Sequence, residues 1–333
     1  MKAMVLAAGL GDRMRPLTDD LPKPLLPVAN RPVVAYILEH LARHGFTRVI
    51  ANLHYRAEQI REALGDGSAY GVELSYAFEE ELWGIAGGVR RCRDFFGDDT
   101  FLVIGADDLT DMDLTALLAH HRRVGAIATI GLAEVEDTSQ FGIVVTDEEG
   151  RIQRFIEKPE EAPPSRLANT QVYLFEPAVF DFIPPDQVYD FGFGAFPRMV
   201  DAGAPFYGFR LPGYWRDIGS IGDYLAAQAD ALEGRVRVRL PGEQVAPGVW
   251  MEVGCAVHPE ARVEAPVSLR QGCRVEQGAR LAGATVLGRE VTVRRGCTLW
   301  NVVAWSGTAV PAGAELRRAV VTPRGICQGM VDE

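Results

Sequence analysis

The chain has 333 residues, a length that suits two domains or one large domain with a sizeable buried core. Hydrophobic residues make up 47% of it and charged residues 24%, the balance of a soluble globular protein. The formal net charge of −11 argues against general binding to nucleic acid or to an anionic membrane, because both attract basic surfaces.

The N-terminal residues do not resemble a targeting segment. The apolar run 1–8 is interrupted by Gly9 too soon for a secretory signal peptide, and no apolar run approaches the length of a membrane span. We therefore expect a cytoplasmic protein without a membrane partner. The five cysteines form no Cys-x-x-Cys pair and their number is odd, so we expect free thiols and no zinc site.

The first expected element is a buried strand over residues 1–8, followed by a glycine-rich loop. Gly9 and Gly11 allow close approach of the backbone, so that main-chain N–H groups can face an anion. Two arginines and Lys23 follow and suit phosphate oxygens. The segment is neither a P-loop, which needs Gly-Lys-Ser/Thr, nor a dinucleotide fingerprint, which needs a third glycine. It indicates a phosphate site; the alternative is an ordinary strand-to-helix turn with solvated arginines.

The next two hundred residues alternate between helical and extended patterns. Helices are expected from Val34 up to Gly45 and over residues 57–64 and 87–96, and strands over 48–53, 72–78 and 101–104. Such alternation predicts an α/β fold with a mostly parallel sheet, whose ligands lie beyond the carboxyl ends of the strands.

Two pairs of charged residues stand at expected strand ends. Asp107 and Asp108 follow the strand 101–104, where carboxylates can hold Mg²⁺; the alternative is a solvated acidic loop. Glu157 and Lys158 precede Pro159, and such a pair can bind the hydroxyls and the phosphate of a sugar phosphate, or can be a surface ion pair of little consequence.

The C-terminal part follows a six-residue period. Large apolar residues stand at every sixth position, each mostly preceded two residues earlier by a small one: Val245, Met251, Val257, Val263, Leu269, Val275, Leu281, Leu287, Val293, Leu299 and Trp305. Neither a helix nor a simple strand has this period, whereas the coils of a hexapeptide parallel β-helix do. We expect these residues to fill the coil interior, Arg270 to face solvent, and Cys255 and Cys273 to stack as small buried residues.

Several of these segments together resemble the signature of the sugar-nucleotide pyrophosphorylases. They are residues 6–27, the metal-strand segment 101–111, residues 155–159, and Trp215-Arg216-Asp217-Ile218-Gly219. The resemblance implies a Rossmann-like, GT-A-like nucleotidyltransferase domain over 1–235 and a left-handed β-helix over 240–333. It implies an enzyme that joins a sugar 1-phosphate to a nucleoside triphosphate and releases pyrophosphate.

The resemblance also assigns roles to residues. Arg13 and Lys23 hold the triphosphate and neutralise the leaving group, and Asp107 and Asp217 hold Mg²⁺. The nucleotide site comprises Leu6, Ala7, Ala8, Gly9, Gly11, Arg13, Glu79 and Gly84, and the sugar-phosphate site comprises Gly142, Glu157, Lys158 and Asn169. We further expect a homo-oligomer.

Glu79 lies in the segment 78–88, which resembles the base-reading part of the family. A carboxylate accepts hydrogen bonds from N1–H and N2–H₂ of guanine, whereas the other bases suit an amide better. GTP and mannose 1-phosphate are therefore the predicted substrates. A thymidylyl-, uridylyl- or adenylyltransferase acting on glucose 1-phosphate is the alternative enzyme.

A third interpretation is a catalytically weak relative that binds a nucleotide sugar and regulates a partner. Its basis is three departures from the family pattern, namely Ala106 and Gln171 in place of glycine and Ile85 in place of threonine. The presence of both metal-site aspartates argues for the enzyme instead.

Overall fold

A computed structural model describes residues 1–328 and divides into two compact units. The first, here the sheet unit, comprises residues 1–10, 37–108 and 112–215. The second, the coil unit, comprises 11–36, 109–111 and the residues from Arg216 onward. The segment that follows the first glycine of the N-terminal loop thus belongs to the same unit as the six-residue repeat. The boundary expected between 235 and 240 stays a prediction.

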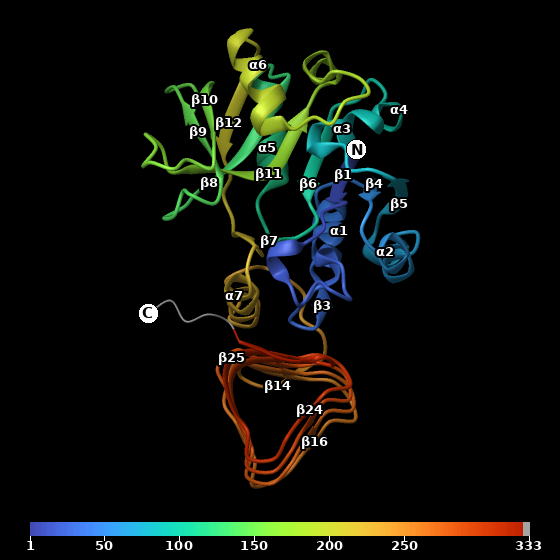
Figure 1. Ribbon diagram of the computed structural model, residues 1–333, viewed down its shortest axis with the longest axis vertical. Helices are drawn as coiled ribbons and strands as arrows, with labels where there is room; N and C mark the ends of the chain where they lie inside the picture. Colours follow the sequence, from blue (N-terminus) through green and yellow to red (C-terminus); the bar gives the residue numbers. More distant parts are fainter. Residues whose placement is uncertain (329–333) are drawn as a thin grey trace. The chain divides into compact units, whose positions relative to one another are not determined.

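The sheet unit is built on a mixed sheet in the order β10-β9-β11-β6-β1-β4-β5, with β8 pairing with β11 and β12 (Figure 1). Its strands are β1 (Lys2–Ala7), β4 (Arg48–Leu53), β5 (Glu73–Phe78), β6 (Phe101–Gly105), β8 (Ala128–Glu134), β9 (Gly142–Thr146), β10 (Ile152–Glu157), β11 (Leu167–Phe175) and β12 (Phe206–Arg210). The strands β6, β1, β4 and β5 are parallel, as the alternating pattern predicts. β11 runs antiparallel to both β6 and β8.

The parallel strands position the site because their carboxyl ends lie side by side in register. Every residue of β6 is buried, and Leu6 near the end of β1 pairs with Gly105 at the end of β6 and with Asn52 in β4. Aromatic side chains form much of the core beside them; the rings of Phe96 and Phe101 stack with centroids 3.9 Å apart. The carboxyl ends of these strands are therefore held rigidly.

The three predicted helices are present with some differences in detail, and further helices follow them. They are α1 (Val33–Arg43), α2 (Ala57–Leu64), α3 (Gly84–Arg91), α4 (Arg93–Phe96), α5 (Leu114–Val124), α6 (Phe196–Asp201) and α7 (Ile221–Leu232). The single helix expected over 87–96 is interrupted at Cys92 and begins three residues earlier. None of the helices among residues 1–328 has the length and hydropathy of a membrane-spanning segment.

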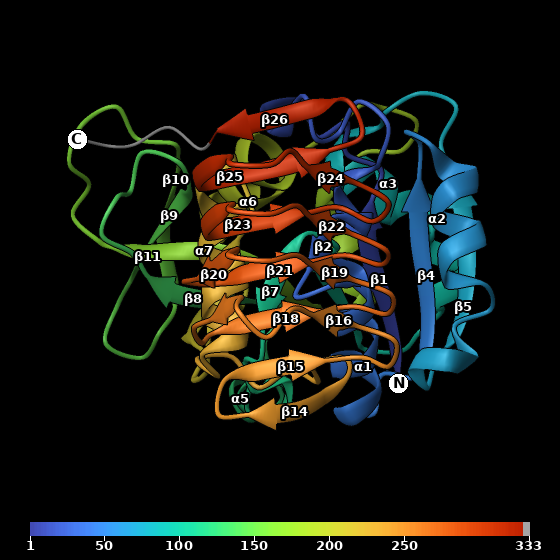
Figure 2. The ribbon, with the colours of Figure 1, turned by 90° about the horizontal axis from the view of Figure 1, so that it is seen from below.

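The C-terminal repeat forms a parallel β-helix. Figure 1 views its coils end-on as a triangle, and Figure 2 shows them from the side as a stack. The coil strands are β15 (Val249–Met251), β16 (Ala256–Val257), β17 (Arg262–Val263), β18 (Val267–Leu269), β19 (Arg274–Val275), β20 (Arg280–Ala282), β21 (Thr285–Leu287), β22 (Thr292–Val293), β23 (Thr298–Ala304), β24 (Ala309–Val310) and β25 (Glu315–Thr322). Each pairs in parallel with the equivalent strand of the next coil, so a residue lies beside the residue at the same repeat position in that coil.

The predicted six-residue register is confirmed in the middle of the β-helix. The hexad residues from Leu269 to Leu299 are buried in one interior cluster. Cys255 and Cys273 are free thiols on successive coils, and burial is the main cause that raises the pKa of Cys273 to about 12.

The register is wrong at both ends. Val245 is 57% exposed because it lies in β14 (Glu243–Ala246), which runs antiparallel to β15 and is not a coil strand. Leu269 pairs with Leu287 eighteen residues on, whereas Leu287 pairs with Ala304 only seventeen residues on. This shorter coil places Ala304 in the interior and Trp305 outside it.

Two further strands end the stack. β14 precedes the first coil strand, and β26 (Gly325–Gln328) folds back antiparallel on β25. Helix α7 belongs to the same unit and anchors the N-terminal segment there. Its Tyr224 hydroxyl donates to the Pro27 carbonyl at 2.8 Å, and the Ala29 N–H donates to the Gln228 side chain at 2.6 Å.

Candidate active site

The end of β1 is fixed by hydrogen bonds within the sheet unit. The Ala7 N–H donates to Oδ1 of Asn52 at 3.0 Å, and the Ala106 N–H donates to the Leu6 carbonyl at 3.2 Å. Gly9 follows in open space, with no atom within 4 Å of the position a Cβ would occupy. A ligand can therefore approach the backbone closely at Gly9.

Glu79 follows β5, and its side chain is only 4% exposed. Its Oε1 accepts a hydrogen bond from Nδ2 of Asn52 at 2.7 Å, and its Oε2 accepts one from the Trp83 N–H at 3.3 Å. Gly88 makes room for this arrangement, because a Cβ there would lie 2.7 Å from Oε1. Both carboxylate oxygens are thus held by the protein, although each keeps further capacity to accept.

Asp107 and Asp108 follow β6 as the sequence predicts. Oδ1 of Asp107, Oδ2 of Asp108 and Oε1 of Gln171 converge beside Gly105, each 3.1–3.2 Å from the position a Cβ would occupy there. Oδ2 of Asp108 also accepts a hydrogen bond from Nε1 of Trp215 at 3.2 Å. Oxygen donors of this kind fit a hard divalent cation. Among residues 1–328, however, no group of three or more His, Cys, Asp or Glu side chains is gathered in a way that could hold a metal ion.

Gln171 occupies its position through an irregularity in β11. The pairing with β8 shifts between Asn169 and Tyr173, and Gln171 adopts a φ of 55°, a left-handed conformation that glycine adopts more easily. The Asn169 side chain fixes this bulge, because its Oδ1 accepts from the Gln171 N–H and its Nδ2 donates to the Tyr173 hydroxyl. Gln171, which replaces the glycine of the family pattern, is thus a strained residue beside two carboxylates.

In the coil unit, Arg13 and Lys23 both lie against Asp217. Nζ of Lys23 is 3.4 Å from Oδ1 of Asp217, and a guanidinium nitrogen of Arg13 is 3.9 Å from Oδ2. Lys23 is mostly buried, whereas more than half of Arg13 is exposed. The structure therefore brings together three residues that were predicted from two motifs far apart in the sequence, with two cations at one carboxylate. The loop before them is closed by the Thr18 hydroxyl, which donates to the Gly11 carbonyl at 2.8 Å.

Glu157 ends β10 and lies against two glycines. A Cβ at Gly142 would lie 2.9 Å from its Oε2, and one at Gly192 would lie 2.6 Å from the same atom. Burial raises the pKa of the Glu157 carboxyl, Lys158 opposes this rise and Asp190 adds to it. Lys158 itself has a φ of 43° and donates its N–H to the Phe141 carbonyl at 3.1 Å. Gly142 and Glu157 thus lie side by side, and their role in binding a sugar phosphate stays a prediction.

The sequence did not identify several residues that shape these sites. Asn52 is the polar residue within an apolar strand, and this contrast was the available signal. Asp190 accepts hydrogen bonds from the Ile85 and Gly192 N–H groups, and it precedes the glycine-containing segment η5 (Phe191–Ala195). Nothing in the sequence alone connects residue 190 to residue 85, because that contact depends on the tertiary fold.

Comparisons with known proteins identify the family of this chain. The model of the family described as "Nucleotidyl transferase" matches residues 2–234. A UTP–glucose-1-phosphate uridylyltransferase of Synechocystis sp. is 39% identical over 333 aligned residues, covering 95% of this chain and 86% of that protein. A mannose-1-phosphate guanylyltransferase of Mycobacterium tuberculosis is 35% identical, covering 95% of this chain and 83% of that protein.

Among solved structures, a putative glucose-1-phosphate thymidylyltransferase from Bacillus anthracis superposes with a TM-score of 0.64 and 26% identity. The superposition covers 73% of this chain and 98% of the Bacillus anthracis chain. The family model and these relatives agree, and the chain belongs to the nucleotidyl transferase family as a sugar-1-phosphate nucleotidyltransferase.

Proposed function

We propose that this chain joins mannose 1-phosphate to GTP, giving GDP-mannose and pyrophosphate. The observation that carries the reaction type is the placement of Lys23 and Arg13 on either oxygen of Asp217. Two cations held beside a carboxylate suit a reaction in which negative charge moves onto a leaving pyrophosphate.

The reaction requires an in-line displacement at the α-phosphorus. A phosphate oxygen of the sugar 1-phosphate attacks, the bond from the α-phosphorus to the bridging oxygen breaks, and pyrophosphate leaves with that oxygen. Lys23 and Arg13 neutralise the charge on the leaving group, and Asp217 keeps both cations in position before substrate binds. The protein forms no covalent bond in this scheme.

We further propose Mg²⁺ as the cofactor, held by Asp107 and Asp217. Both side chains supply the oxygen ligands that this ion prefers, and bound Mg²⁺ would neutralise phosphate oxygens of the nucleotide. At the sugar end, the Glu157 carboxylate accepts from sugar hydroxyls, Lys158 binds the sugar phosphate, and Gly142 and Asn169 line the same pocket. The backbone of residues 6–9, Gly11 and Gly84 would face the nucleotide.

The choice of GTP rests on Glu79. Its carboxylate is fixed by Asn52 and Trp83, and each oxygen retains capacity to accept one hydrogen bond from guanine. A preorganised acceptor pair of this kind favours a base that offers two adjacent donors. We extend the proposal to a cytoplasmic location, in keeping with the triphosphate substrate, and to a homo-oligomer.

UTP and glucose 1-phosphate form the second candidate pair. Two observations favour it: the Synechocystis relative that is 39% identical has a name specifying those substrates, and Glu79 is nearly buried with both oxygens engaged. In this reading Glu79 orients Asn52 and the loop after it, and other groups read the base.

A pyrophosphate-release screen tests both pairs. GTP, UTP, dTTP and ATP are each combined with mannose 1-phosphate and with glucose 1-phosphate in the presence of Mg²⁺. The highest kcat/KM with GTP and mannose 1-phosphate supports the first proposal, and the highest value with UTP and glucose 1-phosphate replaces it with the second. Absence of turnover with every pair, together with retained binding of a nucleotide sugar, would favour the regulatory relative.

A further inference from the structure

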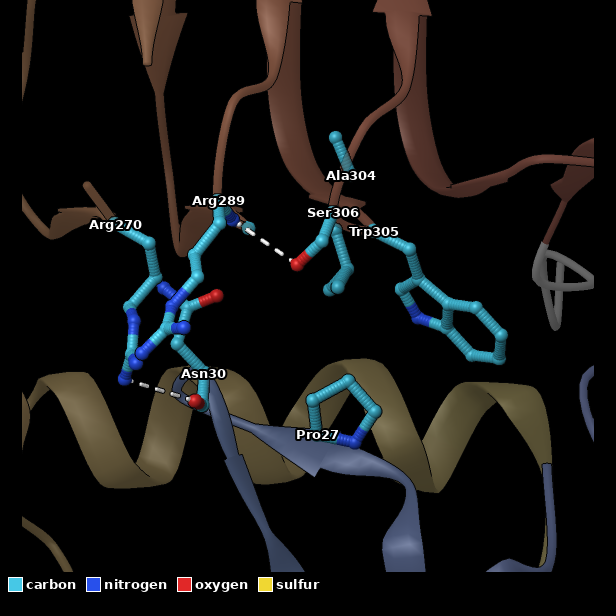
Figure 3. Close-up of a pocket in the computed structure, with 9 residues that line it drawn as sticks. Pro27, Asn30, Arg270, Arg289, Ala304, Trp305 and Ser306 are labelled. Carbon is cyan, nitrogen blue, oxygen red and sulfur yellow. Dashed lines mark hydrogen bonds between the residues drawn. The ribbon is translucent and has the colours of Figure 1, made fainter. Parts of the chain in front are cut away.

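A second pocket lies within the coil unit, apart from the residues assigned to the reaction. It has a volume of about 200 Å³. It is lined by Pro27 and Asn30 on one side and by coil residues on the other, and Figure 3 shows Arg270, Arg289, Trp305 and Ser306 around it. No part of the proposed reaction uses it.

The short coil described above creates this pocket. Because Ala304 takes the interior position, Trp305 and Ser306 face outward and form a wall. The Trp305 ring is held there by a hydrogen bond from Nε1 to the Tyr224 hydroxyl at 3.3 Å. Gly288 permits the coils to approach, since a Cβ there would lie 2.5 Å from the Ser306 nitrogen.

The pocket carries an excess of positive charge. Arg270 is 16% exposed, pairs with Glu252 at 3.1 Å and donates to the Asn30 carbonyl at 3.2 Å. In Figure 3 the Arg289 side chain extends beside that of Arg270 toward Asn30. Among residues 1–328 the Arg289 guanidinium has no hydrogen bond or ion pair, although the backbone N–H of Arg289 donates to the Ser306 hydroxyl at 3.0 Å. Arg270 was expected to face solvent, and the structure corrects this: it is covered by the segment that contains Asn30.

Two guanidinium groups side by side repel each other unless an anion lies between them. Burial lowers the pKa of Arg270, Glu252 opposes this effect, and Arg289 adds to the lowering. The two guanidinium groups bring two positive charges to the pocket. Glu252 neutralises Arg270 and leaves the charge of Arg289 unmatched. This local positive charge contrasts with the net charge of −11 of the chain.

We propose that this pocket binds a small phosphate oxyanion between Arg270 and Arg289. Planar guanidinium groups bind tetrahedral phosphate through paired N–H donors, and the Ser306 hydroxyl adds a further donor. A cavity of about 200 Å³ holds several water molecules at roughly 30 Å³ each, enough for phosphate or pyrophosphate but not for a whole nucleotide. The shared chemistry is the phosphate group, and its source is either the inorganic ion or a pyrophosphate product.

Calorimetry and thermal unfolding of the full chain test this proposal. Phosphate and pyrophosphate are titrated separately, with chloride at matched ionic strength as the reference. The test variants are Arg289→Gln, which removes a charge that has no partner, and Ser306→Asp, which places a carboxylate in the pocket. Arg295→Gln is the matched control, because Arg295 is likewise exposed on the β-helix and lines neither side of the pocket. Arg13→Gln weakens anion binding at the proposed reaction site.

We expect the wild type to bind at least one of the two anions and to unfold at higher temperature in its presence. Arg289→Gln should weaken this binding by roughly tenfold or more, as expected for a lost charge-assisted hydrogen bond, and Ser306→Asp should do the same. Arg295→Gln and Arg13→Gln should retain it. The anion that binds more tightly identifies whether the phosphate group comes from the inorganic ion or from pyrophosphate.

Three results would overturn the proposal: no binding of either anion by the wild type, unchanged binding in Arg289→Gln, or complete loss of binding in Arg13→Gln. The last result would place the anion at the reaction site alone. Because none of these measurements needs turnover, failure of the proposed reaction leaves this test intact. Arg289→Gln removes no side-chain hydrogen bond or ion pair among the described residues, and its unfolding temperature in chloride serves as the check that it folds.

Discussion

The carboxylate of Glu79 accepts a hydrogen bond from the side-chain amide of Asn52 at 2.7 Å, and both side chains are buried. The other end of that amide accepts from the Ala7 N–H, so the two residues connect the ends of three neighbouring strands. A buried polar chain of this kind is stable only when every member is satisfied. A change at Glu79 therefore acts on substrate choice, on the loop after β1, or on both.

Replacing Glu79 by Gln distinguishes these possibilities. If Glu79 reads guanine, one acceptor becomes a donor and faces a guanine hydrogen. The mismatch should cost about 1–3 kcal/mol, or roughly one to two decades in kcat/KM with GTP. Values with UTP and dTTP should not fall. Glu80→Gln, the exposed neighbour, should leave all three nucleotides unaffected. An equal loss with every base in Glu79→Gln would assign Glu79 to loop positioning.

Asp107→Asn and Asp217→Asn keep the side-chain size and remove the charge. Each should lower kcat by about 10² or more, as for other lost transition-state electrostatics. Asp98→Asn is the control, since that exposed carboxylate lies outside the proposed site. Initial rates should be measured across a range of Mg²⁺ concentrations. Near-normal turnover in Asp107→Asn at low Mg²⁺ would remove Asp107 from the mechanism.

Glu157 should give the pH profile of the reaction an acidic limb, at a pH above the ordinary pKa of a carboxyl group. Burial raises its pKa, so the folded protein keeps this proton to higher pH than the unfolded chain does. Its contribution to the free energy of unfolding therefore decreases as pH rises from the ordinary carboxyl pKa through the raised one. The ionised form is the stronger acceptor for sugar hydroxyls, so the KM for sugar 1-phosphate should rise as pH falls through the raised pKa.

The comparison that checks this limb is the pH profile of KM for wild type, Glu157→Gln and Glu160→Gln. The Glu157 variant should show a high KM and lose the limb, while titration of the sugar phosphate itself remains in all three profiles. Glu160 is exposed and serves as the control. A limb that persists unchanged in Glu157→Gln would exclude Glu157 as its source.

Adjacent residues of the β-helix should differ sharply in how well they tolerate substitution by a charged residue. Val275 is 2% exposed in the interior cluster, and Arg274 beside it is exposed. Val275→Asp buries a charge without a partner and should destabilise by about 3 kcal/mol or more. Arg274→Asp should change little. Urea unfolding midpoints provide the measurement, and equal sensitivity at the two positions would contradict the inward register.

The sequence predicted those parts of the fold that repeat a local pattern. β4 and α2 occupy the residues expected, and the hexads from Leu269 to Leu299 face inward, because periodic burial directly determines which residues are apolar. Trp305 was misplaced because a coil one residue shorter keeps its backbone pairing while shifting the repeat. The six-residue period of the sequence does not reveal a coil that is one residue shorter; the strand pairing does.

The site was predictable where a motif is continuous and less so where it depends on packing. Arg13 and Lys23 came from one continuous N-terminal motif and Asp217 from a second, and the three lie together within the coil unit. The engagement of Glu79 by Asn52, and the bulge that turns Gln171 toward Asp107, depend on contacts between strands distant in sequence. Such contacts leave no signal in a single chain beyond an isolated polar residue in an apolar strand.

The reversed strands β14 and β26 have a consequence for association between molecules. A parallel β-helix ends in a row of backbone N–H and C=O groups that another chain can extend into a fibre. Here each end finishes in a four-residue antiparallel strand, with Pro241 and Pro247 flanking β14 and Pro323 preceding β26. Short strands bounded by proline are poor templates for further pairing. We therefore expect these two strands to disfavour end-to-end pairing of the coils between molecules.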